Sequence, residues 1–316
     1  MRQLIIRRLL QTIPMLFFVS VACFAMVKLA PGDPVLSFVT PNMHAEDIER
    51  IRHNLGLDKP GYVQYFLWIK EVASGNLGYS LINHQPVLGQ ILERLPATAG
   101  LMGFSIGLAV LLAIPLGLLA GANRNRWIDK GMNLFSYVGI SVPLFWLAIM
   151  LIYFFSIKLH WLPSMGMRTI GVQSAADVIK HGILPCVVLA FGFLAIYVRY
   201  IRSSTIGQLK EDYVQIQYAF GSTKRIILYR HVMKHVLLPV ITLLGMSMGE
   251  LVAGAIVTET VFSWPGIGTL GMTAVKGMDY PVIMGITLFS SVMLIVGNLA
   301  ADILYGIADP RIKTKG

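Results

Sequence analysis

The chain has 316 residues, of which 55% are hydrophobic and 13% charged, and its mean hydropathy is +0.68. This composition excludes an ordinary soluble domain and is typical of a protein that crosses a membrane several times. The net charge of +10 does not indicate nucleic-acid binding, because Lys and Arg also gather on the cytoplasmic loops of membrane proteins.

Six apolar runs are long enough to cross about 30 Å of hydrocarbon as helices. None of them alternates like a strand, and a backbone in lipid satisfies its polar groups only within a helix or a closed barrel. The predicted fold class is therefore an all-α integral membrane protein with six transmembrane helices. The runs lie near residues 9–29, 98–121, 134–156, 183–201, 237–258 and 283–306.

The positive charges predict the orientation. Sixteen of the 26 Lys and Arg residues lie in four segments, which the positive-inside rule places in the cytoplasm together with both termini. The start of the chain imitates a secretory signal, but its apolar run continues past Cys23 to Leu29 and five more spans follow, so we expect an uncleaved first helix in a multi-pass membrane protein. The four segments are 1–8, 122–133, 199–236 and 307–316.

These boundaries divide the chain into four parts. Residues 1–29 form the cytoplasmic N-terminus and the first transmembrane helix, 30–94 an extracytoplasmic segment, 95–306 a transmembrane domain of five helices, and 307–316 a cytoplasmic tail. Helical patterns at Ala45–Asn54 and 63–73 lie between turn signals, which predicts that the extracytoplasmic segment is a small folded cap. This cap would either dock a soluble partner or pack on the bundle.

Small residues recur at four-residue spacing within the apolar runs, which allows transmembrane helices to approach closely. The pairs are Gly103 and Gly107, Gly117 and Gly121, and Gly245 and Gly249. In the fifth run the small residues surround Glu250, an intramembrane carboxylate and hence a functional candidate. We predict that Gly249, Glu250 and Gly254 line a transport pathway, in which Glu250 could serve as an ion or proton site.

Motifs for catalysis and cofactor binding are weak. The segment 266–271, Gly-Ile-Gly-Thr-Leu-Gly, matches a dinucleotide-binding pattern but follows no predicted strand, so its glycines more simply shape a turn. His231 and His235 have the spacing of a zinc pair, but the acid of a metalloprotease motif is missing between them, so a solvated basic face near the lipid headgroups is the better explanation. We predict no catalytic residue, no metal site and no cofactor bound by this chain. With no phosphate-binding loop present, any ATP that drives the protein must be bound by another chain.

The polar loop of about 203–236 is the most distinctive segment. The pattern from Asp212 to Gly221 predicts a short helix that ends at the glycine. A second helix is expected to begin at Ser222 and to lead into the fifth span. The expected result is a helix-turn-helix projection from the membrane. An apolar stripe on the first helix would pack on the bundle or lie in a groove of a soluble subunit. The stripe consists of Leu209, Tyr213, Ile216 and Phe220.

At these residues the sequence resembles the membrane-spanning subunits of binding-protein-dependent ABC importers, specifically the oligopeptide/dipeptide/nickel permease family. The loop resembles the family's cytoplasmic coupling motif through Ala219, Gly221 and Leu238-Pro239. Further motifs extend the resemblance over nearly the whole chain. They include Pro31-Gly32-Asp33-Pro34, Arg94-Leu95-Pro96-Ala97-Thr98, Ile114-Pro115-Leu116-Gly117, Glu259-Thr260-Val261-Phe262-Ser263-Trp264-Pro265-Gly266, Asp279-Tyr280-Pro281 and Asp309-Pro310-Arg311.

The resemblance implies a multi-pass permease subunit of the cell (inner) membrane, without enzymatic activity, that forms half of a translocation pathway for peptides. Its implied partners are a homologous second permease, two cytoplasmic ATPases that use ATP, an extracytoplasmic solute-binding protein, the peptide substrate and membrane lipid, but no nucleic acid. The residues implied in coupling to an ATPase are Asp212, Tyr213, Ile216, Gln217, Ala219, Phe220 and Gly221.

Two residues of the loop depart from the family pattern. Gln217 stands where a second small residue is expected and Phe220 where a charged one is common, which predicts a bulkier and more apolar contact surface.

The sequence also leaves two other classes of function open. One is an ion- or proton-coupled secondary transporter that uses Glu250, and the other is a scaffold that anchors a soluble complex.

Overall fold

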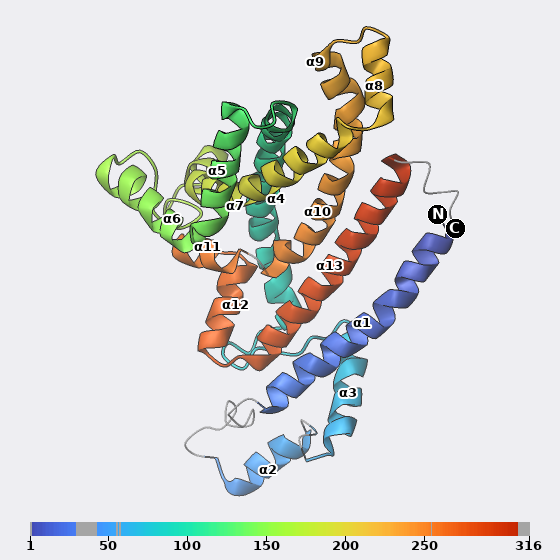
Figure 1. Ribbon diagram of the computed structural model, residues 1–316. Helices are drawn as coiled ribbons and strands as arrows, with labels where there is room; N and C mark the ends of the chain where they lie inside the picture. Colours follow the sequence, from blue (N-terminus) through green and yellow to red (C-terminus); the bar gives the residue numbers. More distant parts are fainter. Residues whose placement is uncertain (1, 30–42, 55, 57, 254, 309–316) are drawn as a thin grey trace.

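The computed structural model describes residues 2–29, 43–54, 56, 58–253 and 255–308, and in these residues the chain forms helices and turns without a named strand (Figure 1). The helices are, in chain order, α1 (Arg2–Leu29), α2 (Ala45–Asn54), α3 (Gly61–Ala73), α4 (Val87–Ala122), α5 (Trp127–Ser141), α6 (Leu144–Leu151), the π-helix η2 (Ile152–Lys158), α7 (Ala175–Gln208), α8 (Asp212–Ala219), α9 (Lys224–Ile226), the π-helix η3 (Ile227–Val232), α10 (Met233–Ala253), α11 (Ile256–Val261), α12 (Ile267–Lys276) and α13 (Tyr280–Ala308).

The expected all-α membrane class is confirmed. Within the described residues, four helices are long and apolar enough to cross a membrane, namely α4, α7, the continuous helix from Lys224 into α10, and α13. The bent pair of α5 with α6–η2 makes five if it counts as one span, and α1 contributes a shorter apolar stretch, Leu10–Met26. The number of six spans and their orientation stay predictions.

The third predicted span is not straight. Trp127–Ser141 and Leu144–Lys158 meet at an angle of 97° where one helix over 134–156 was expected. Pro143 causes the break, because it lacks an N–H for the helix and disfavours helical geometry at the residue before it. Val142 is accordingly extended, with φ −76° and ψ 121°.

The centre of the bundle is formed by α4 and α7, which run side by side in the same direction. They approach closely at two glycines, since a Cβ atom on Gly117 or Gly121 would lie 2.6 Å from the side chain of Ile201 or Thr205, respectively. Gly245 similarly allows α10 to approach Ala301 on α13. A Cβ on Gly103 or Gly107 would meet nothing within 4 Å, so this pair forms no close contact in the chain.

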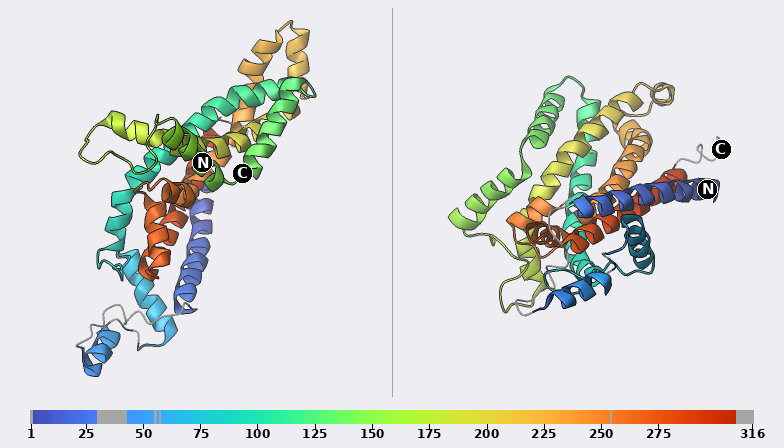
Figure 2. Two further views of the ribbon diagram at one scale, coloured as in Figure 1. Left: turned by 90° about the vertical axis from the view of Figure 1, so that its left-hand side faces the viewer. Right: turned by 90° about the horizontal axis from the view of Figure 1, so that it is seen from below.

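The segment 30–94, which is predicted to be extracytoplasmic, contains the two expected helical patches as α2 and α3. Both lie at the end of the molecule opposite α8 (Figures 1 and 2). Residues 30–42, including the motif of 31–34, lie outside the described part of the chain. The next helix, α4, begins at Val87 and thus extends well ahead of the predicted transmembrane boundary at residue 95.

Candidate functional site

The polar loop forms the expected projection, with α8 beside the helix that begins at α9 (Figure 1). Gly221 has φ +76°, which is the left-handed conformation that ends helices. Its N–H donates to Tyr218 O at 2.9 Å, and the N–H of Ser222 donates to Gln217 O at 3.0 Å. These two bonds form a Schellman motif. Thr223, rather than the expected Ser222, caps the second helix by accepting from the N–H of Ile226.

The base of the projection packs on the second helix and the bundle. Val214 is fully buried and belongs to the main core cluster, against which Leu209 and Tyr213 pack. The Tyr213 ring lies 5.2 Å from the His235 ring, and its hydroxyl donates to Gln208 Oε1 at 2.9 Å. Burial raises the pKa of the Tyr213 hydroxyl. These contacts fix the position of α8 relative to the helix that runs from η3 into α10.

The tip of the projection is exposed and apolar. The exposed fraction is 52% for Ile216 and 81% for Phe220, and Ala219 beside them is also exposed. The predicted stripe therefore divides, because its first half packs on the bundle while Ile216 and Phe220 face outward. Leu209 is not part of the short helix but ends α7, and Val214 takes the buried position on α8.

The polar members of the predicted set support the helix. Asp212 lies in the first turn of α8, where a negative charge interacts favourably with the helix dipole. Gln217 is half-buried, and its Oε1 accepts from the Ser222 hydroxyl at 3.2 Å. The structure thus brings all seven predicted residues onto one projection, with three of them forming its apolar tip.

A hydrogen bond joins the projection to the end of one long helix, α4. Lys224 Nζ donates to Ala122 O, in the last turn of α4, at 2.8 Å. Nearby, the Arg202 guanidinium of α7 forms an ion pair with the buried Asp129 carboxylate of α5, with Nη2 to Oδ2 at 3.0 Å. A displacement of the projection would therefore act on α4 directly.

A second polar network involves Thr98, in the first half of α4, and sequence analysis did not predict the roles of its individual residues. The first N–H groups of α12 require acceptors from outside the helix. The N–H of Ile267 donates to Thr98 Oγ1 at 2.8 Å, and those of Gly268 and Thr269 donate to Glu259 Oε2 at 2.7 and 3.2 Å. The Thr98 hydroxyl in turn donates to Glu259 Oε1 at 2.7 Å. Two motifs distant in the sequence thus cap one helix.

The same network accounts for the dinucleotide-like motif of 266–271. A Cβ on Gly266 would collide with the Glu259 carboxylate, and a Cβ on Gly268 would lie 2.6 Å from the Ile256 backbone. The glycines are thus required for close packing around Glu259, and the N–H groups that a phosphate would need already donate to protein oxygens. Burial raises the pKa of the Glu259 carboxyl, while the hydrogen bonds from Thr98 and the α12 backbone lower it.

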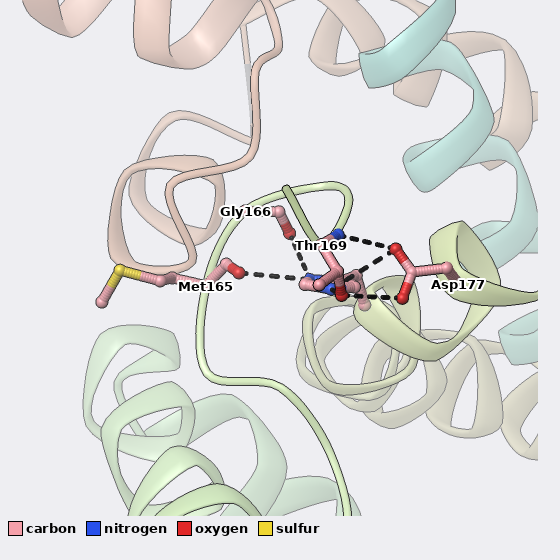
Figure 3. A network of polar contacts seen from close by, with 5 residues as sticks. Met165, Gly166, Thr169 and Asp177 are labelled. Atoms are coloured by element: carbon pink, nitrogen blue, oxygen red, sulfur yellow. Dashed lines mark hydrogen bonds and ion pairs between the residues drawn. The ribbon is translucent and has the colours of Figure 1, made fainter. Parts of the chain in front are cut away.

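A third network organises the loop between η2 and α7 (Figure 3). The buried His181 ring places Nδ1 at 3.1 Å from both Met165 O and Gly166 O, so Nδ1 carries a proton. Asp177 accepts from the N–H and hydroxyl of Thr169 at 2.6 and 2.9 Å. The N–H of Gly166 donates to the carbonyl of residue 262, which joins this loop to the segment that contains Glu259.

The described residues give no contacts for the predicted pathway residues and no arrangement of side chains for a metal site. Gly249 and Glu250 belong to the backbone of α10, but their side-chain surroundings, and Gly254 altogether, lie outside the described residues. In the part of the chain that is described, no three His, Cys, Asp or Glu side chains are placed to hold a metal ion. The His235 ring packs on Tyr213 instead.

Comparison with known proteins identifies the class and then the family. Helices long and apolar enough to cross a membrane, with a polar helical projection at one end, define a multi-pass membrane protein. Residues 1–102 match the N-terminal family of binding-protein-dependent transport system membrane components, and residues 113–314 match the binding-protein-dependent transport system inner membrane component family. The chain belongs to this family of inner membrane permease components.

Relatives of similar length share more than a third of their residues with the chain. The chain is 39% identical to the oligopeptide transport system permease protein AppB of Bacillus subtilis, over 98% of each chain. It is 38% identical to the glutathione transport system permease protein GsiC of Escherichia coli O6:H1, over 98% of this chain and 99% of the relative. A dipeptide transport system permease protein, DppB of Alkalihalophilus pseudofirmus, is 36% identical, over 97% and 98%.

One solved structure supports the fold. The inward-facing MetNI methionine ABC transporter contains a chain that superposes with a TM-score of 0.54 at 13% identity, covering 70% of this chain and 97% of that one.

Proposed function

We propose that this chain is the permease subunit of an ATP-driven importer of peptides and forms half of the translocation pathway. Family membership and relatives named for oligopeptide, dipeptide and glutathione transport support this proposal. The observation that carries it is the α8 projection, whose apolar tip is exposed while its base is packed. The same family membership favours ATP-driven transport over an ion-coupled mechanism through Glu250.

In this proposal α8 enters a groove on a cytoplasmic ATPase subunit. A short helix that presents Ile216 and Phe220 on a rigid base is suited to such a groove, because burying large apolar side chains favours association. ATP binds to the ATPase and not to this chain. The complete importer contains a homologous second permease, two ATPases and a binding protein on the opposite side of the membrane.

The transmission path follows from the contacts. Movement of α8 displaces the second helix, and the bond from Lys224 to Ala122 passes the displacement to α4. The close contacts at Gly117 and Gly121 oblige α7 to move with α4. In the first half of α4, Thr98 holds the cap of α12, so α4 joins the projection to this cap.

Substitution at the tip tests the proposal. Phe220→Asp removes the apolar contact, whose burial contributes about 2 kcal/mol, and should weaken ATPase association at least about tenfold. Gln215→Asp is the matched control, since it adds the same charge to another exposed position of α8. Association is measured by co-purification and titration of the ATPase against the permease, and coupling by peptide uptake per ATP hydrolysed.

Unchanged association and uptake in Phe220→Asp would remove the coupling role. Peptide uptake by the reconstituted chain alone under an ion gradient, without any ATPase, would overturn the importer.

A further inference from the structure

The helix α3 has an aromatic surface that the proposed import function does not use. Tyr62 and Phe66 lie one turn apart, with exposed fractions of 69% and 65%, and none of the residues of α3 is buried. We propose that α3 is an interfacial helix that places this aromatic flank against the lipid of the adjacent leaflet. By the predicted orientation this is the outer leaflet.

One side of α3 is held against the first apolar helix. The Tyr65 ring packs edge-on against Phe17 and Phe24, with ring centroids 6.3 and 5.5 Å apart, and Trp68 lies 6.0 Å from Phe24. The Tyr65 hydroxyl also forms a 2.8 Å hydrogen bond with the Ser20 hydroxyl, in the middle of the apolar run of α1. These contacts place α3 beside lipid-facing residues and not at a distance from the bundle.

The other sides of α3 differ in polarity. On a helix, Tyr62 and Phe66 point to one flank, whereas Gln64 and Glu71 point to the opposite flank. Lys70 lies between the two flanks and is exposed. An amphipathic helix with aromatic side chains on one flank and a lysine at its margin is suited to the boundary between headgroups and acyl chains.

The aromatic flank continues an apolar surface of the neighbouring span. Phe18 and Met26 of α1 are about as exposed as Phe66, and in a membrane protein such side chains on a spanning helix contact lipid. The flank of α3 and this surface adjoin through the Tyr65 and Phe17 contact. Lipid is therefore the occupant that the structure favours for this flank, and a soluble binding protein is not.

Site-specific fluorescence in a membrane tests the proposal. The two native cysteines, Cys23 and Cys186, are replaced by alanine, and a fluorophore that responds to polarity is attached to Phe66→Cys, to Tyr62→Cys or to the control Glu71→Cys. Each full-length variant is reconstituted in phosphatidylcholine vesicles, with ordinary or brominated acyl chains, and iodide serves as the quencher from water.

We expect brominated lipid to reduce the fluorescence at positions 62 and 66 at least about twofold more than at position 71, because an interfacial helix buries its apolar side about 5–10 Å deep. Iodide in the water should instead quench position 71 more than positions 62 and 66. Equal iodide quenching at 66 and 71 would show that the flank faces water and would overturn the proposal. Protection of position 66 from both quenchers would also overturn it, because the flank would then be covered by protein. Neither outcome bears on the coupling role of α8.

Discussion

At the scale of single residues, Glu259 and Thr98 show how two separate motifs serve one structural purpose. The carboxylate of Glu259 is fully buried, yet it receives donors from Thr98 and from the backbone of α12. A buried charge without such partners would be costly. The glycines around it are therefore required by close approach and not by ligand binding.

The glycine motif of 266–271 contains both a closely packed glycine, Gly268, and a less crowded one, Gly271, which serves as the control. Gly268→Ala should destabilise the fold, because the new Cβ would lie 2.6 Å from the Ile256 backbone and overpacking costs about 1–3 kcal/mol. Gly271→Ala should be tolerated, since its Cβ would meet the Ile286 side chain at 3.6 Å. The thermal unfolding midpoints of both purified variants are compared with that of the unmodified protein. Equal midpoints for the two variants would contradict the close-packing explanation.

At the scale of elements, the projection depends on where α8 stops. The Schellman motif turns the chain so that Phe220 remains outside while Val214 faces the core. The sequence predicted the helix and its glycine stop, because both are local patterns. It did not predict which half of the stripe is exposed, since this depends on the position of η3 against α8.

Gly221→Ala should destabilise the end of α8 by about 1 kcal/mol, because a non-glycine residue is strained at positive φ. Space is not the cause, as a Cβ at this position would meet nothing within 4 Å. Gly207→Ala is the control, since Gly207 lies within α7 with equally open surroundings and no positive φ. Hydrogen exchange of the α8 amides should be faster only in Gly221→Ala. The same rates in both variants would show that the left-handed stop is not required.

At the scale of the whole molecule, α4 links the projection to the network around Glu259. Its last turn accepts the hydrogen bond from Lys224, Gly117 and Gly121 contact α7, and Thr98 in its first half holds the α12 cap. A single long helix therefore contacts each of the structures that coupled transport would move.

Removal of the Lys224 amine should reduce the coupling of ATP hydrolysis to peptide uptake but should leave the association with the ATPase intact. Lys224→Met abolishes the hydrogen bond to Ala122 O and the favourable charge at the end of α4, which together contribute about 1 kcal/mol. Arg225→Met is the control for loss of one exposed positive charge. Peptide uptake per ATP hydrolysed in the reconstituted importer should fall in Lys224→Met only. Equal coupling in both variants would remove Lys224 from the transmission path.

The sequence by itself determined the membrane class, most of the helices, the short helix α8 with its glycine stop and the family, because hydropathy, charge and short motifs act over neighbouring residues. Only the tertiary structure decided the 97° bend in the third span, the exposure of Phe220 and the meeting of Thr98 with Glu259, which lie 161 residues apart. The bend has a local cause in Pro143, but its angle depends on the packing of α6 against α7 and α11. A partner distant in the sequence leaves no periodic signal along the chain, so it becomes visible only when the helices are packed together.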